Sequence, residues 1–164
     1  MIFTALPPIA PITFPNKQAC PTTIEPLAKL LVRDLPSYAN RAALKNGTRF
    51  QVPEMSQVII ASQANLEPLK LPGIQQISDP NLHQLFITTL ERQTFNQTTS
   101  KLQQYHWLFL VQTREGWKLS QSFTRISPYP LVSRITPPRE SSQSITAQAI
   151  KIWLRDCQAG AIRS

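Results

Sequence analysis

Few side chains in this sequence are of the types that carry out covalent or metal chemistry. The 164 residues include two cysteines and two histidines. Cys20 precedes the first segment that is typical of regular structure, and Cys157 lies in the last one. A bridge between them would close nearly the whole fold, which is worth about 5 kcal/mol in loop entropy, and it would indicate an oxidising compartment. We predict a Cys20–Cys157 disulfide, with two inert reduced thiols as the alternative.

The sequence has no pattern typical of a metal site or of a cysteine nucleophile. It contains no CxxC, and neither His83 nor His106 has a carboxylate at ligand spacing. His106 alternates with leucines, which favours a hydrogen-bonded histidine inside a sheet. Cys157 falls near the C-terminus of a helix, where the helix dipole disfavours a thiolate. We therefore expect no metal, no cofactor and no catalytic residue.

Acid–base catalysis by a carboxylate has one candidate position. Glu91 alone among the nine acidic residues falls in a predicted strand that can face a concave side of the sheet, and most of the others fall in helix ends or turns. A solvated strand position is the ordinary interpretation of such a residue. A hydrolase that uses Glu91 or His106 is kept as a second alternative function.

Aromatic residues beside basic ones are the strongest binding signal. Tyr105, Trp107 and Phe109 alternate along one predicted strand, and Arg125 lies on the strand that follows. Stacking aromatics flanked by cations are typical of single-stranded nucleic-acid surfaces, but cross-strand aromatic pairs also stabilise sheets. We favour packing and expect no nucleic-acid partner. If this face forms a pocket, Tyr105, Trp107, Phe109 and Arg125 are the candidate ligand-binding residues.

The charge of the chain is strongly positive but dispersed. The net charge is +8, and each of the 17 Lys and Arg residues stands singly. Dispersed charge is typical of general solubility, although a binder of an anionic polymer or membrane surface is an alternative. No window of about 18 apolar residues occurs, so we expect no integral membrane span.

Two helices are predicted to flank the central part of the chain. Thr22 and Glu25 form a capping-box pattern, followed by leucines at helical spacing. Pro36 predicts a break into two helical pieces, because proline removes a helical hydrogen bond. A second helix is expected from a cap at Ser141 or Ser142 to about Gln158.

The central part is predicted to be antiparallel sheet. Strands are expected over 56–62, 85–95, 101–113 and 117–126, joined in part by turns at 96–99 and 114–116. Alternation places Tyr105, Trp107 and Phe109 on one face, and His106 with Leu108 on the other. The expected fold is α+β, with an antiparallel sheet of four to five strands and both helices on one face. Residues 20–160 form the single domain, and residues 1–19 are a proline-rich arm or the remnant of an export signal.

The stretch Cys20–Arg41 carries a recognisable phrase. The sequence LLVRDLPSYANR, at positions 30–41, together with the preceding Cys-Pro, resembles the opening of a family of uncharacterised cyanobacterial proteins that carry a signal peptide. The resemblance implies export, to the periplasm or the thylakoid lumen, and implies no activity. The function that we expect is that of a non-enzymatic exported accessory or binding protein. The sequence indicates neither its ligand nor its oligomeric state.

Overall fold

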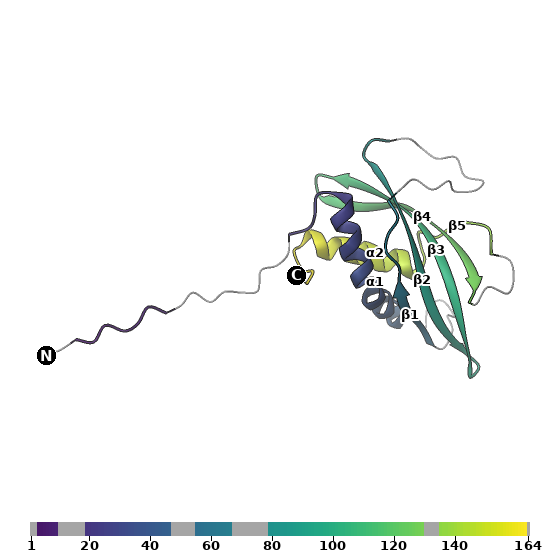
Figure 1. Ribbon diagram of the computed structural model, residues 1–164, viewed down its shortest axis with the longest axis horizontal. Helices are drawn as coiled ribbons and strands as arrows, with labels where there is room; N and C mark the ends of the chain where they lie inside the picture. The colour runs from purple at the N-terminus through teal and green to yellow at the C-terminus, as the bar shows by residue number, and fades with distance from the viewer. Residues whose placement is uncertain (1–2, 10–18, 47–54, 67–78, 130–134, 164) are drawn as a thin grey trace.

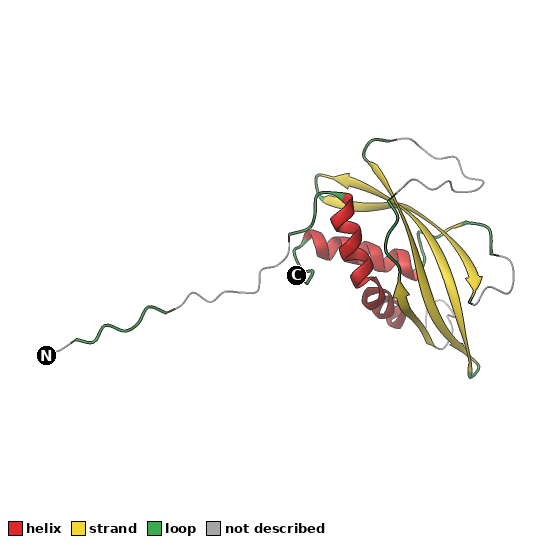
Figure 2. Ribbon diagram, viewed as in Figure 1, coloured by secondary structure: helices red, strands yellow, loops and turns green. Residues whose placement is uncertain are grey.

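The structure is a computed structural model, and it describes residues 3–9, 19–46, 55–66, 79–129 and 135–163. The elements follow in the order α1 (Ile24–Asn46), β1 (Met55–Ala61), β2 (Leu82–Phe95), β3 (Thr98–Thr113), β4 (Gly116–Pro128), β5 (Arg139–Glu140) and α2 (Ile145–Gln158). The strands form one antiparallel sheet in the order β1-β2-β3-β4-β5. Both helices lie on the same side of it (Figures 1 and 2). The predicted α+β class is confirmed.

Helix α1 corrects one detail of the prediction, because it continues through Pro36 without a break. Leu31, Leu35 and Ala39 are buried on both sides of the proline, so packing outweighs the missing hydrogen bond. The helix also begins later than expected. Leu27 N–H donates to the carbonyl of Thr23 at 3.4 Å, which puts Thr23 rather than Thr22 at the N-cap.

Helix α2 begins after a serine other than the two expected. Ser144 has extended backbone angles, and its hydroxyl accepts a hydrogen bond from Ala147 N–H at 3.1 Å. This is the usual geometry of a serine N-cap. Ser141 instead lies beside β4, where its N–H donates to the Ser122 carbonyl at 2.7 Å.

The two long hairpins, β2–β3 and β3–β4, have short turns at their tips. The turn between β2 and β3 places Asn96 and Gln97 at positive φ, as type I′ turns require. In the turn between β3 and β4, Gly116 has φ +105° and approaches the Gln158 side chain so closely that a Cβ there would collide with it. The tip of this hairpin therefore packs against the C-terminal end of α2.

The main core lies between the sheet and the two helices. Trp153 of α2 is fully buried there, as are the apolar side chains that face it from α1 and from the sheet. The largest contributors are Leu27, Leu31, Leu35, Leu85, Ile87, Leu108, Leu110 and Ile150. Because α1, the sheet and α2 share this core, they fold as one unit.

The predicted disulfide is confirmed: Cys20 and Cys157 are bonded, with their Cα atoms 5.0 Å apart. Two further contacts hold the segment after Cys20 to the β3–β4 hairpin. Trp117 Nε1 donates to the Pro21 carbonyl, and Gln112 Nε2 donates to the Thr22 carbonyl, both at 2.9 Å. The start of the fold is thus fixed to α2 covalently and to the sheet by hydrogen bonds.

Residues 3–9 are extended, and their side chains are exposed. The other residues of the predicted arm up to 18 lie outside the described residues, as does most of the irregular connection expected between the first two strands. Neither α1 nor α2 has the length and hydropathy that crossing a membrane requires.

Candidate functional site

The four predicted ligand-binding residues share the sheet face that points away from the helices. Tyr105, Trp107 and Phe109 follow one another at every second position of β3, and Arg125 of β4 lies directly opposite Tyr105. Phe123 and Phe86 complete this outer aromatic cluster: Trp107 lies 5.1 Å from Phe86, and Phe109 lies 6.1 Å from Phe123, between ring centroids. The structure therefore brings the four together as the period of two predicted.

The accessibility of these residues differs along the face. Trp107 and Phe109 are only 6% and 8% exposed, so their rings serve packing. Arg125 Nε donates to the Thr136 carbonyl at 2.9 Å, and Tyr105 Oη donates to Gln103 Oε1 at 3.2 Å. Trp107 Nε1 is also buried, and no described residue is its hydrogen-bond partner. None of the pockets lined by described residues contains any of the four.

His106 lies on the opposite face, under the helices, and is 1% exposed. Its Nε2 pairs with Thr89 Oγ1 at 2.9 Å and its Nδ1 with Thr124 Oγ1 at 3.0 Å. Thr124 Oγ1 in turn donates to Ser141 Oγ at 2.7 Å. Burial lowers the pKa of His106 to about 4. The histidine is neutral and internally hydrogen-bonded, as expected, and it borders no described pocket from which a substrate could reach it.

Glu91 contradicts the expectation of a solvated position. It is 8% exposed and accepts a hydrogen bond from Gln104 Nε2 on the neighbouring strand. Glu91 lies opposite Leu102, on the same face of the sheet as His106 and away from Tyr105, Trp107 and Phe109, and the sequence did not reveal the partner that lets its carboxylate be buried. Both cysteines are used in the disulfide, so neither is available as a nucleophile. Within the described ranges, no group of three or more His, Cys, Asp and Glu residues could hold a metal ion.

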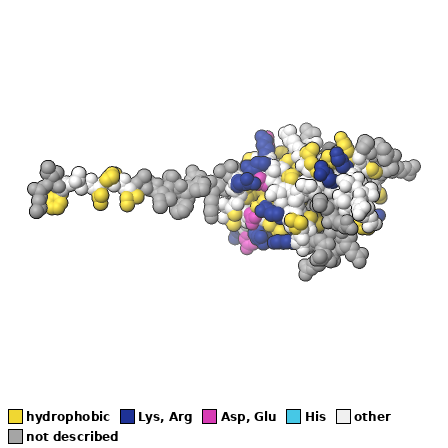
Figure 3. All heavy atoms as spheres, turned by 90° about the horizontal axis from the view of Figure 1, so that it is seen from below, with side chains coloured by type: hydrophobic (Ala, Val, Ile, Leu, Met, Phe, Trp, Pro, Cys, Tyr) yellow, Lys and Arg dark blue, Asp and Glu magenta, His cyan; other side chains and the backbone are white. Residues whose placement is uncertain are grey.

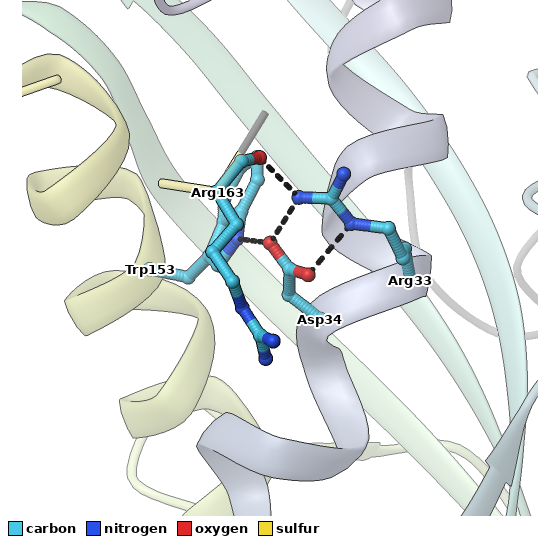
Figure 4. A network of polar contacts seen from close by, with 4 residues as sticks. All are labelled: Arg33, Asp34, Trp153 and Arg163. Atoms are coloured by element: carbon cyan, nitrogen blue, oxygen red, sulfur yellow. Dashed lines mark hydrogen bonds and ion pairs between the residues drawn. The ribbon is translucent and has the colours of Figure 1, made fainter. Parts of the chain in front are cut away.

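The polar residues of the phrase at positions 30–41 join elements of the fold. Figure 4 shows Asp34 of α1 between Arg33 and Trp153 of α2. Arg33 Nε donates to Asp34 Oδ1 at 2.8 Å, and Trp153 Nε1 donates to Asp34 Oδ2 at 2.9 Å. Burial alone would raise the pKa of Asp34, but these hydrogen bonds outweigh it and the pKa lies below its ordinary value. Arg33 Nη2 also donates to the Arg163 carbonyl at 2.8 Å.

Two residues in the second half of the phrase also bond to other elements of the fold. Tyr38 Oη donates to Asp156 Oδ2 on α2 at 2.7 Å. Asn40 bonds to both backbone groups of Val58 in β1: its Nδ2 donates to the carbonyl at 3.2 Å, and its Oδ1 accepts from the N–H at 2.7 Å. The side chains of Asp34, Tyr38 and Asn40 therefore position α1 against α2 and the sheet.

A groove lies between the β3–β4 hairpin and α2. Its volume is about 600 Å³, within the range of small-molecule and peptide sites. We call it the α2–β4 groove. It is lined by Glu115, Trp117, Lys118 and Leu119 from the hairpin side and by Lys151, Ile152, Leu154, Arg155, Gln158 and Ala159 from the side of α2.

The α2–β4 groove has an apolar floor and a basic rim. Trp117 and Leu154 are buried at its base. Lys118, Lys151 and Arg155 are exposed around it, against the single acidic residue Glu115. Figure 3 shows Lys and Arg side chains, with Asp and Glu among them, at the end of the folded body nearest the N-terminal segment, and further Lys and Arg side chains toward the other end. An anionic group with an apolar part is the ligand chemistry that such a groove complements.

The sequence did not reveal this groove. Lys151 and Arg155 have the spacing of neighbours on one helix face, but Lys118 is far from both along the chain. The packing of the hairpin tip on α2 brings the three together. The comparisons with known proteins add no further candidate, since no family model, curated protein or solved structure matches the chain.

Proposed function

We propose that this chain is a non-enzymatic, exported binding protein that holds an anionic, partly apolar ligand in the α2–β4 groove. The observation that carries the proposal is the groove itself: three exposed cations surround an apolar floor. Neither buried titratable group of the sheet, His106 or Glu91, lines it. The site therefore has the parts needed to bind an anion with an apolar portion.

Export is supported by two features of the chain. The Cys20–Cys157 disulfide is of the kind that persists in oxidising compartments. The resemblance of residues 20–41 to an exported cyanobacterial family points the same way and names the periplasm or the thylakoid lumen.

The binding proposal is tested with dodecyl phosphate, an anionic amphiphile that presents both chemistries of the groove. We expect binding by calorimetry that weakens steeply as salt is added, because the rim charges are exposed. The triple variant Lys118→Gln/Lys151→Gln/Arg155→Gln should lose this affinity by about tenfold or more, since each lost charge contact is worth on the order of 1 kcal/mol.

The matched control removes the same number of charges elsewhere. Arg92, Lys101 and Arg139 are exposed on the strands and do not line the groove. Their replacement by Gln should leave the affinity within about twofold, a difference of roughly 0.4 kcal/mol. Equal losses in both triple variants would indicate binding to net charge, on an anionic surface for example, and would refute the groove. Absence of binding at low salt would refute the proposal as a whole.

A further inference from the structure

The α2–β4 groove runs along the edge of the sheet. Trp117, Lys118 and Leu119 are consecutive in β4, and all three line the groove. Consecutive side chains of a strand point to opposite faces. A groove that touches three in a row therefore meets the strand from its side, where backbone groups point outward.

This side of β4 has no neighbouring strand over the length of the groove. Strand β5 pairs with β4 at Phe123 and Thr124. From Gly116 to Gln121, the only strand beside β4 among the described residues is β3. In an antiparallel strand every second residue directs its N–H and C=O away from its partner. The groove thus contains backbone donors and acceptors placed as a further strand would require.

At the opposite edge of the sheet, formed by β1, a side chain occupies the outward-facing backbone groups of one residue. There, the side-chain amide of Asn40 occupies both the N–H and the C=O of Val58 in β1. Because an amide mimics the peptide group of an added strand, Asn40 blocks pairing at that point. The two edges compared are β1 at Val58 and β4 beside α2. Of these, the edge of β4 opens into a groove with volume for a strand.

Charge decides which strand the groove accepts. Lys118, Lys151 and Arg155 repel a second copy of this chain, whose own β4 would bring the same cations to the contact. Ile152 and Leu154 offer apolar surface on the side of α2. An added strand would direct one set of its side chains toward the face of Lys118 and the other toward α2, where Lys151 and Arg155 lie beside Ile152 and Leu154.

We infer that the α2–β4 groove binds an extended acidic segment of a partner protein, which adds to the sheet as a strand beside β4 between Gly116 and Gln121. This rests on the proposed function and names its ligand class. Main-chain hydrogen bonds to β4 supply affinity, and the cations select acidic side chains.

The test uses a capped heptapeptide of alternating Glu and Val, with three relatives. In one relative each Glu is replaced by Lys. The other two carry N-methyl groups on alternate amides, in complementary sets. An added strand turns one set of its amides toward β4 and the other toward solvent. We therefore expect the parent to bind, the Lys peptide to fail, and one methylated set to lose about tenfold or more in affinity while the other keeps it.

Each other result overturns a stated part. If both methylated peptides bind as the parent does, the contact is through side chains and strand addition is wrong, although the basic groove stands. Equal binding of the Glu and Lys peptides would refute selection of acidic segments. If dodecyl phosphate binds in the groove and the Glu peptide does not, the inference fails and the proposed function survives. Failure of both ligands would refute the two together.

Discussion

Single polar side chains join the elements of this protein. Asp34 fixes α1 to Trp153, Tyr38 fixes α1 to Asp156, and Asn40 fixes α1 to Val58 of the sheet. All three belong to the sequence phrase at positions 30–41. Each has at least one polar side-chain atom bonded to another element of the fold. In this structure the three side chains therefore serve to pack α1 against α2 and the sheet.

His106 gives the first prediction. Its pKa is lowered to about 4 by burial, against about 6.5 in an unfolded chain. Between these values the unfolded state binds the proton and the folded state does not, so stability is full above pH 6.5 and falls as the pH drops. The loss by pH 4 should reach about 3 kcal/mol, measured by urea unfolding across this range.

Two variants isolate this contribution. His106→Gln keeps a polar side chain among Thr89 and Thr124 but cannot be protonated, so its stability should change less between pH 6.5 and 4. His83→Gln alters the other histidine, which packs edge-on against Trp117 at 5.2 Å, and it should retain the full loss. A His106→Gln profile that parallels the unmodified chain would contradict the assignment.

At the scale of elements, helix α1 shows packing that overrides a local rule. Proline inside a helix costs about 3 kcal/mol relative to alanine, yet α1 passes through Pro36 because Leu31, Leu35 and Ala39 are buried around it. The local sequence rightly predicted that a helix exists here and wrongly predicted that it breaks. The local rule includes the free-energy cost of proline in a helix. It does not include the burial of neighbouring side chains, which offsets that cost.

Pro36→Ala should therefore stabilise the protein. Restoring the helical hydrogen bond recovers up to about 3 kcal/mol, and the greater freedom of the unfolded chain returns up to about 1 kcal/mol of this. We expect a net gain of about 2 kcal/mol in the free energy of unfolding. Pro36→Gly, the control, restores the same N–H with poorer helix propensity and should gain less. A destabilised alanine variant would show that the packing of α1 depends on the proline.

The strands and the candidate sites differ in how far the sequence predicts them. Alternation within β3 correctly separated Tyr105, Trp107 and Phe109 from His106, because successive side chains of a strand point to opposite faces of the sheet. The burial of Glu91 and the α2–β4 groove were missed. Both depend on which strand or helix lies beside which, and a single segment carries no such information.

At the scale of the whole molecule, the Cys20–Cys157 bond joins the two ends of the folded part. Replacing both cysteines by serine should lower the free energy of unfolding by up to about 5 kcal/mol, because the bond closes almost the entire fold. Urea unfolding of oxidised protein against the double variant measures the difference. Reductant should lower the stability of the unmodified chain and have no effect on the variant. An unmodified chain indifferent to reductant would contradict this account.

The same bond gives the protein a property that concerns cleavage. Between Cys20 and Cys157 the backbone and the disulfide form a closed ring. A single cut by a protease within this ring opens it but separates nothing, so both fragments stay attached and the shared core can stay assembled. A chain cut once in this way would persist as a nicked but intact body. Its fragments would part on a gel only after reduction.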